Sequence, residues 1–527
     1  MPRVGVIASN LLLAPSASAS ASAAASAAAV ASVAVSTAVA PLYTLASEAA
    51  ASTISAGDTA WVLTSTALVL LMNIPGLSLF YGGLTRQKNV LSMLAQCFAC
   101  TAVVTVLWTA VGYSMAFSTV GMEAGVVNPS SFVGGLDKCF LAGVSASSVW
   151  GTIPEILFFA FQCTFAIITP ALMVGAFAER MKFSAVMLFV ALWSLAVYSP
   201  VAHAVWGGAG SFFGDMGVLD FAGGIVVHVT AGIGALLACI MVGPRKDAIT
   251  RPHSLVLTMI GAGMLWVGWF GFNGGSALSA SGAAAMALVA TQISAATAAL
   301  VWMALDLMDP AVAKPSALGI ATGSIAGLAA ITPAAGFVGP LGACVIGAVS
   351  AVLCRIFTME LKFKWNYDDA LDVFNVHGVG GIVGTLLVSV FAHPMFGGNQ
   401  VGIDIWAQLL VQSGATVGVG LYTLVVSWVL LKSRSVQLII GCAAARWPSA
   451  LRDALLELRA VSAMTGGLRD DAVEALGMDS EHGEEGYHLT PPEPAPRSST
   501  TLPVPPLLVP APQVVHHTPH ALTPSPA

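Results

Sequence analysis

Charged side chains are scarce in this chain, and their scarcity excludes a soluble protein. Only 9% of the 527 residues are charged, 57% are hydrophobic, and the mean hydropathy is +0.84. A soluble domain of this length needs a polar surface that this composition cannot supply. The sequence therefore predicts a membrane protein, for which the prior of one domain per ~150 residues does not hold.

Motifs for metals, nucleotides and redox chemistry are also missing. The eight cysteines lie mostly in apolar runs, and Cys97 and Cys100 have no second close pair that would complete a metal site. The sequence contains no ATP-binding motif and no motif for a redox cofactor. We therefore expect a protein that is not an enzyme and that has no cofactor, no metal and no nucleic-acid partner.

Apolar runs occupy most of the chain between residues 61 and 431. About 20 apolar residues in a helix cross the ~30 Å hydrocarbon core of a bilayer. The predicted spans lie at about 61–83, 90–117, 151–177, 183–205, 220–243, 255–278, 283–308, 316–334, 337–359, 372–393 and 406–431. The predicted fold is thus an all-α polytopic membrane protein with eleven transmembrane helices.

Basic residues gather in every second loop between these spans, and this asymmetry predicts the orientation. Among the remaining loops only one basic residue occurs, Lys138. The basic loops carry Arg86, Lys88, Arg180, Lys182, Arg245, Lys246, Arg251, Lys314, Arg355, Lys362, Lys364, Lys432 and Arg434. The positive-inside rule then places the N-terminus outside and the C-terminus in the cytoplasm.

Two histidines lie inside apolar runs, and each follows an aspartate by eight residues. His228 follows Asp220, and His377 follows Asp369. A titratable ring in hydrocarbon is costly in free energy and indicates a functional site. A bond to a neighbouring helix would explain one such residue, but the matched spacing favours a shared role. Neutral imidazole both donates and accepts hydrogen bonds, so the pair can guide a small solute or a proton through an apolar lumen.

The predicted orientation brings both histidines to the same depth from opposite faces. The span after Asp220 runs inward and the span after Asp369 runs outward, and eight helical residues rise ~12 Å. This arrangement predicts an inverted repeat, in which spans one to five are mirrored by spans six to ten and the eleventh is a final helix. A weaker echo supports the repeat, because Phe80-Tyr-Gly-Gly83 ends the first span and Phe272-Asn-Gly-Gly275 ends the sixth.

Aromatic side chains near the predicted outer ends form a second group, which contains Phe161, Phe165, Trp206, Trp269 and Phe272, with Ser276 beside them. Aromatic faces attract cations, and more strongly when they are desolvated. An aromatic belt at the membrane interface explains any one of these residues equally well. Their spacing alone does not decide between a cation site and a belt.

The segments outside the spans differ from them in composition. Residues near the N-terminus are rich in alanine and serine, and residues near the C-terminus are rich in proline, which is typical of disorder. The predicted order is an extension or targeting segment at 1–57, a membrane domain at 58–432, an atypical insertion at 433–463, a cytoplasmic regulatory tail at 464–490 and a disordered tail at 491–527.

Several motifs in the correct order resemble the ammonium transporter family. The stretch from Asp220 to Gly232, which continues to Arg245, is similar to the signature of that family. Further similar stretches are Phe161–Phe165, Gly175–Arg180, Ala202–Gly208 and Gly268–Ser276, with Gly467–Arg469 and Glu481–Glu484 in the tail. The resemblance covers residues 58–432 and about 464–488, and the insertion between them departs from the family pattern.

The resemblance implies a homotrimer in which each subunit conducts through its own pore. It assigns ammonium recruitment to Phe161, Phe165, Trp206 and Ser276. It assigns a phenylalanine gate to Phe165 and Phe272, the pore lining to the twin histidines His228 and His377, and the role of supporting acid to Asp220. It also implies a plasma-membrane location for nitrogen uptake, methylammonium as a further substrate and a cytoplasmic regulator at the tail.

We expect recruitment of NH4+, its deprotonation near the gate, and passage of NH3 beside the histidines, with or without the proton. One alternative is a Rhesus-like neutral channel for NH3 or CO2, although Trp206 and Ser276 favour the ammonium branch. Another is an ammonium sensor, although the tail has no recognisable catalytic output domain. A membrane enzyme that uses the histidines as metal ligands would need a third ligand, and none is evidently spaced to join them.

Overall fold

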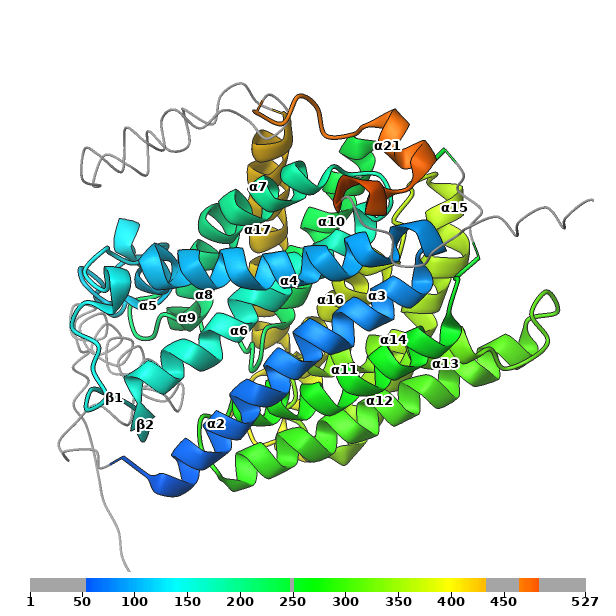
Figure 1. Ribbon diagram of the computed structural model, residues 1–527. Coiled ribbons are helices and arrows are strands. Elements are labelled where there is room, and N and C mark those ends of the chain that lie inside the picture. Colours follow the sequence, from blue (N-terminus) through cyan, green and yellow to red (C-terminus); the bar gives the residue numbers. More distant parts are fainter. Residues whose placement is uncertain (1–53, 247–250, 433–463, 483–527) are drawn as a thin grey trace, which may run out of the picture. The chain divides into compact units, whose positions relative to one another are not determined.

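The structure is a computed structural model that describes residues 54–246, 251–432 and 464–482 (Figure 1). Helices dominate the described residues, as the composition predicted. The predicted insertion at 433–463 lies outside the described residues. The same holds for residues 1–53 of the N-terminal extension and for everything after residue 482.

Ten helices in the described part of the chain are long and apolar enough to cross a membrane, and an eleventh apolar helix is shorter. All eleven coincide with predicted spans, and the short one is α13 (Ala317–Ile331). The five spans of the first predicted repeat are α2 (Ala56–Leu71) with η1 (Met72–Leu77) and α3 (Ser78–Leu84), η2 (Gln87–Asn89) with α4 (Val90–Leu107), η3 (Trp108–Gly112) and α5 (Tyr113–Phe117), α6 (Glu155–Val174) with η6 (Gly175–Phe177), α7 (Phe183–Trp193) with η7 (Ser194–Tyr198) and α8 (Ser199–Trp206), and η8 (Gly224–Val229) with α10 (Thr230–Val242). The other spans of the second repeat are α11 (Leu255–Gly275), α12 (Gly282–Met308), α14 (Pro340–Ile356) with η9 (Phe357–Leu361) and α15 (Lys362–Lys364), and η10 (Phe374–Gly378) with α16 (Val379–Phe391). The final helix is α17 (Ile405–Lys432).

Short elements connect these helices or follow them. The connections contain η4 (Pro129–Ser131), η5 (Cys139–Leu141), the antiparallel strands β1 (Val149–Trp150) and β2 (Ile153–Pro154), α9 (Phe212–Asp215) and η11 (Pro394–Phe396). The tail contains α21 (Asp471–Leu476) and η12 (Met478–His482).

The first helices of the two predicted repeats pack closely and antiparallel. A Cβ atom added at Gly261 of α11 would lie 2.2 Å from the backbone nitrogen of Phe80. One added at Gly268 would lie 2.3 Å from the Cβ of Met72. Later residues of α11 thus meet earlier residues of the first span, and glycine allows the two backbones to approach this closely. Figure 1 shows α2 and α11 side by side.

The last helices of the two repeats cross in the same way. A Cβ atom at Gly232 of α10 would lie 2.3 Å from the Cα of Gly378, and one at Gly381 of α16 would lie 2.8 Å from the Cβ of His228. The crossing is again antiparallel, because the later residue of one chain segment meets the earlier residue of the other. Two antiparallel crossings between equivalent spans are what an inverted repeat requires.

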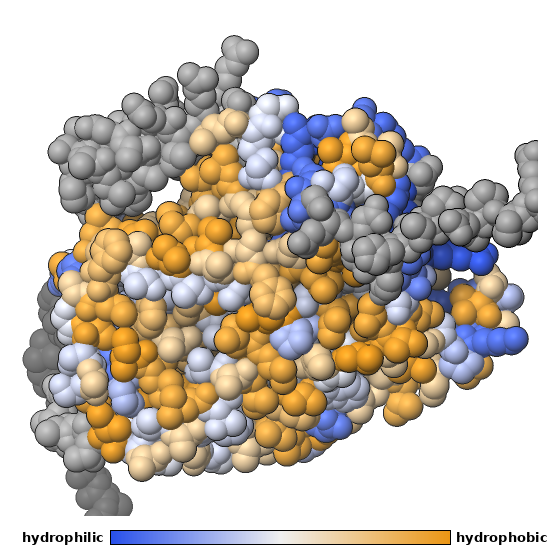
Figure 2. Space-filling view, viewed as in Figure 1, coloured by the Kyte–Doolittle hydropathy of each residue, from blue (hydrophilic) through white to orange (hydrophobic). Residues whose placement is uncertain are grey.

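Large apolar side chains remain exposed along the spans. Phe98, Val106, Leu300, Val417 and Leu421 are each more than half exposed. Apolar surface covers most of the face in Figure 2, whereas hydrophilic residues gather around α21. Helices with such faces need an apolar surrounding, because a monomeric soluble protein rarely exposes large apolar patches. The chain is therefore an integral multi-pass membrane protein.

Candidate functional site

Two histidine rings meet in the interior of the helix bundle. The ring centroids of His228 and His377 lie 5.3 Å apart with 16° between their planes. His228 is fully buried, and His377 is 5% exposed. Each ring projects from a π-helical turn, η8 or η10, at the beginning of its span. Trp269 lies parallel to both rings, with centroid distances of 5.6 Å to His228 and 6.5 Å to His377.

A hydrogen-bonded threonine assigns the tautomer of His228. The Thr332 hydroxyl donates to the Leu328 carbonyl at 2.8 Å and accepts the Trp269 indole N–H at 2.9 Å. It has no second hydrogen to donate, so His228 Nε2, at 3.3 Å, must donate to it. In the neutral ring Nδ1 then holds the free lone pair. Within the described residues, Nδ1 of His228 and of His377 are both buried without a hydrogen-bond partner.

The aspartate before each histidine caps the beginning of the helix that carries the ring. Asp220 accepts four backbone N–H groups at 2.5–3.0 Å, from Gly223, Gly224, Ile225 and Val226. Asp369 accepts the N–H of Phe374 at 2.8 Å. A carboxylate at a helix N-terminus satisfies unpaired donors and complements the helix dipole. The matched spacing is therefore the distance from an N-terminal cap to a ring inside the bundle.

A chain of aromatic rings connects the histidines to the protein surface. The stacked rings of Phe165 and Phe272 have centroids 4.2 Å apart, and Phe272 lies 6.1 Å from the His228 ring. On the other side, the ring centroid of Phe165 lies 6.1 Å from that of Trp206 and 5.0 Å from that of Phe161. Trp206 is partly exposed, whereas the three phenylalanines are buried. The stacked pair thus separates an accessible indole from the buried histidines.

Backbone carbonyls fix the two polar groups of the predicted recruitment site. The indole N–H of Trp206 donates to the Asp220 carbonyl at 2.8 Å. The hydroxyl of Ser276, one turn after Phe272 on α11, donates to the Phe272 carbonyl at 2.8 Å. The single hydroxyl hydrogen of Ser276 is thereby used, and its oxygen lone pairs can accept hydrogen bonds from a ligand.

Trp269 lies deeper than the sequence predicted. It was expected with the aromatic residues near the outer end of its span. Two helical turns separate it from Ser276, which corresponds to ~10 Å of rise. Its ring therefore packs against the two histidines and is 1% exposed.

A network of ion pairs joins several of the basic loops at one end of the bundle, which we call the basic end. Glu179 pairs with Arg86 at 3.2 Å and with Arg245 at 3.4 Å. Arg245 also binds Asp368 through its Nε and Nη2 atoms, at 2.9 and 2.8 Å. Burial raises the pKa of Asp368, but the bonds to Arg245 outweigh this effect, and the pKa lies below its ordinary value.

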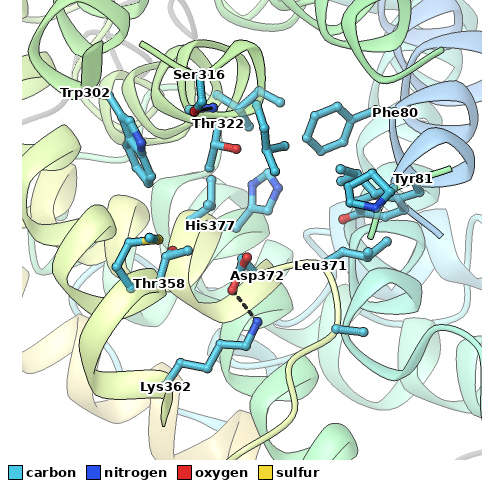
Figure 3. A pocket seen from close by; sticks show the side chains of 18 of the residues that line it. Phe80, Tyr81, Trp302, Ser316, Thr322, Thr358, Lys362, Leu371, Asp372 and His377 are labelled. Carbon is cyan, nitrogen blue, oxygen red and sulfur yellow. Dashed lines mark hydrogen bonds and ion pairs between the residues drawn. The ribbon is translucent and has the colours of Figure 1, made fainter. Parts of the chain in front are cut away.

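A cavity of about 330 Å³ extends from the basic end to His377 (Figure 3). Aromatic, hydroxyl and charged side chains line it together with this histidine. They include Phe80, Tyr81, Trp302, Asp306, Ser316, Thr322, Thr358, Lys362 and Asp372. His377 is therefore reached from the basic end, whereas the aromatic chain approaches His228 from the other side.

The tail is held at the basic end by carboxylates that accept backbone N–H groups of the loops and spans. Asp479 accepts from Ser92 near the beginning of α4 at 2.8 Å, and Glu481 accepts from Phe183 at the beginning of α7 at 3.0 Å. Glu474 accepts from Lys246 at 3.0 Å. Glu474 and Asp479 are 2% and 4% exposed. The described tail thus binds its own chain, next to the ion-pair network.

All of the predicted pore residues lie in one connected group, but sequence reasoning missed some of their neighbours. Thr332 and the pair of Lys362 and Asp372 were not singled out. Asp372 lies five residues before His377, a spacing that would have been a usable signal. In the described part of the chain no three histidine, cysteine, aspartate or glutamate side chains converge as metal ligands.

Comparison with known proteins gives a consistent result. The model of the Ammonium Transporter Family matches residues 60–443. The chain is 43% identical over 450 residues to a protein named ammonium transporter from Aquifex aeolicus, which covers 85% of this chain and 96% of that protein. It is 39% identical over 444 residues to an ammonium transporter from Bacillus subtilis, which covers 82% of this chain and 98% of that protein.

Solved structures with the same fold include the crystal structure of Candida albicans Mep2. That structure has a TM-score of 0.65 and 35% sequence identity, and the match covers 72% of this chain and 84% of Mep2. A structure described as a sensor Amt protein has a TM-score of 0.67 and 25% identity, and the match covers 81% of this chain and 98% of that protein.

Proposed function

This chain belongs to the Ammonium Transporter Family, and we propose that it moves ammonium across a membrane along the chain of rings from Trp206 to His377. The observation that carries this proposal is the contact between the two buried histidines, one reached through aromatic rings and the other from a cavity. The path changes from a partly exposed indole to buried rings, so it distinguishes solutes by their ability to lose charge.

Recruitment of NH4+ takes place at Trp206 and Ser276, with Phe161 and Phe165 beneath them. An aromatic face attracts a cation, by about 0.5–2 kcal/mol depending on its desolvation. The free lone pairs of the Ser276 hydroxyl accept an N–H from the ion. Potassium resembles ammonium in size and charge but has no hydrogen to donate, so the hydroxyl favours ammonium.

Passage through the gate requires loss of the proton. The stacked rings of Phe165 and Phe272 are hydrocarbon and cannot solvate an ion, and an unpaired charge in an apolar surrounding is strongly disfavoured. Neutral NH3 does not carry this penalty. It meets the free lone pair at Nδ1 of His228, which accepts an N–H of the passing molecule. The released proton crosses the membrane as well, and its movement gives the transport the net charge that a current requires.

Asp220 supports both parts of the path. Its carboxylate caps the helix turn that carries His228, and its carbonyl orients Trp206. Its role is that of a positioning residue, because its carboxylate is already occupied by backbone donors.

The charge distribution supports an orientation, and the family supports a location and an assembly. The positive-inside rule makes the basic end cytoplasmic, with the N-terminus outside. We place the protein in the plasma membrane as a homotrimer with one pore in each subunit. The tail is then cytoplasmic, and its contacts at 474, 479 and 481 make it the place for a regulator to act.

A second candidate function is an ammonium sensor, which the similarity to a structure described as a sensor Amt protein favours. A sensor would bind ammonium at the same outer residues without sustained transport. A neutral gas channel is the other alternative, and the partly exposed Trp206 beside a buried aromatic gate argues for cation recruitment instead.

Proteoliposomes that contain the purified full chain distinguish these three functions. Electrogenic transport predicts a saturable current upon addition of ammonium, and potassium at the same concentration does not reduce it. A change of internal pH without current would support the neutral gas channel. Ammonium binding without current or pH change would support the sensor and contradict transport.

A further inference from the structure

The cavity at the basic end contains an ion pair directly below the second histidine. Lys362 Nζ lies 2.8 Å from Asp372 Oδ1, and both side chains line the cavity together with His377. Figure 3 shows this pair joined by a dashed line, on the side of the cavity below the ring of His377. The two side chains are 13% and 24% exposed, so solvent screens their attraction only in part.

Asp372 is held in place by more than the lysine. Its Oδ1 atom also accepts the side-chain N–H of Asn375 at 2.8 Å, and the Tyr367 hydroxyl donates to the other end of that amide. Its backbone has a φ of +59°, in the left-handed region that residues other than glycine rarely adopt. Such a conformation persists only where its surroundings enforce it, and it often marks a functional position.

The chemistry of the pair resembles the chemistry of the proposed substrate. A lysine side chain ends in an ammonium group with three donors, and it binds a carboxylate as free NH4+ would. Ammonia that has passed His377 enters this cavity and takes a proton from solvent water, which releases hydroxide to the cytoplasmic side. An unpaired Asp372 carboxylate would then hold the product in the cavity.

We propose that Lys362 acts as a tethered ammonium group that occupies the cation position beside Asp372 and so prevents retention of the transported ion. This inference rests on the proposed function. The other charged groups that line the cavity have their own partners, because Asp306 binds Arg355 and Arg245 binds Asp368. Asp369 is close in sequence, but it is fully buried and does not line the cavity, and its Oδ2 atom caps η10. Lys362 therefore decides whether Asp372 is available to a free cation.

The test measures how strongly ammonium on the cytoplasmic side inhibits uptake. The full chain is expressed in oocytes, known amounts of ammonium chloride are injected, and initial uptake of labelled methylammonium is recorded. In Lys362→Met the freed carboxylate binds cytoplasmic ammonium, so half-inhibition is expected at about five-fold lower ammonium than in the parent, the strength of a modest ion pair. The conservative Lys362→Arg should behave like the parent.

Two further variants separate this role from a structural one. The double variant Lys362→Met/Asp372→Asn lacks the Asp372 carboxylate that the loss of Lys362 frees, so its sensitivity should return to that of the parent. Lys364 lies exposed on the same short helix, and Lys364→Met is the matched control. Surface labelling corrects each rate for the amount of protein in the membrane.

The outcomes are distinguishable from a failure of the proposed function. Absence of uptake by the parent would overturn the proposed function and this inference with it. Uptake by the parent, together with equal inhibition of Lys362→Met and the parent, would overturn the inference alone. If Lys362→Met does not reach the membrane, Asp372→Asn decides, because it must be at most as sensitive as the parent and greater sensitivity contradicts the inference.

Discussion

The indole N–H of Trp206 donates to the backbone carbonyl of Asp220 at 2.8 Å. The carboxylate of the same aspartate accepts four N–H groups at the beginning of η8, the turn that carries His228. One residue thus connects the partly exposed end of the ring chain to its buried end. A change at Asp220 must therefore alter both the outer site and the position of the first histidine.

Asp220→Asn is expected to destabilise the protein by about 1–3 kcal/mol and to lower transport. The amide has only one oxygen, so some of the four buried N–H groups lose their acceptor. Thermal unfolding in detergent and uptake of labelled methylammonium measure the two effects. Glu123→Gln, which neutralises an exposed acid, is the control. Unchanged stability and uptake in Asp220→Asn would contradict the assignment.

Asp369 makes the stability of the protein depend on pH. Burial raises the pKa of its carboxyl from an ordinary value of 3.8 to about 6. The folded state then binds the proton more tightly than the unfolded state. The resulting contribution to the free energy of unfolding is fully present below pH 3.8 and is lost as the pH rises to about 6. Its full size is on the order of 3 kcal/mol. The stability of the parent relative to Asp369→Asn should fall between pH 4 and pH 6, and a constant difference would contradict this.

Trp206→Leu should raise the ammonium concentration at half-maximal uptake by about five- to thirty-fold, because a partly desolvated cation-π contact contributes ~1–2 kcal/mol. Uptake at saturation should change much less, since the histidines remain in place. Concentration series of initial rates measure this. Trp406 is 75% exposed at the beginning of α17, and Trp406→Leu is the matched control. Equal half-saturation in Trp206→Leu and the parent would exclude recruitment by the indole.

The sequence predicted the spans, the twin histidines and the inverted repeat, because each of these features leaves a local pattern in the chain. The spans are visible because each needs a long apolar run. The two histidines can be recognised in the sequence because a polar ring inside a long apolar run is rare. The antiparallel packing of Gly232 on Gly378 follows from the inverted repeat, since small residues mark close helix contacts.

Other features depend on register and on distant contacts, which a linear pattern does not contain. The π-helical turns that carry His228 and His377 have no distinct sequence signal. The position of Trp269 between the outer end of its span and the histidines depends on where α11 ends, which is at Gly275. The ion pair of Lys362 and Asp372 joins residues on either side of a loop, and only the fold brings them to one cavity. The boundaries of the insertion at 433–463 stay a prediction.

Release of the tail should follow from loss of one buried carboxylate. Asp479→Ala removes the acceptor of the Ser92 N–H at the beginning of α4, which costs about 1 kcal/mol, as for other helix caps. Arg469, whose side chain is 22% exposed in the docked tail, should then be cut faster by trypsin. Leu476→Ala changes an exposed tail residue and is the control. Equal cleavage rates in Asp479→Ala and the parent would show that this contact does not hold the tail.

The most direct test of the account is the ammonium-evoked current of purified protein in proteoliposomes, measured for the parent, His228→Ala and His377→Ala. His393→Ala, in a connection outside the ring chain, is the control. We predict a saturable current in the parent and in the control that potassium does not affect, and a clearly altered current in both histidine variants. Parent-like current and selectivity in His228→Ala and His377→Ala would contradict a path between these two rings.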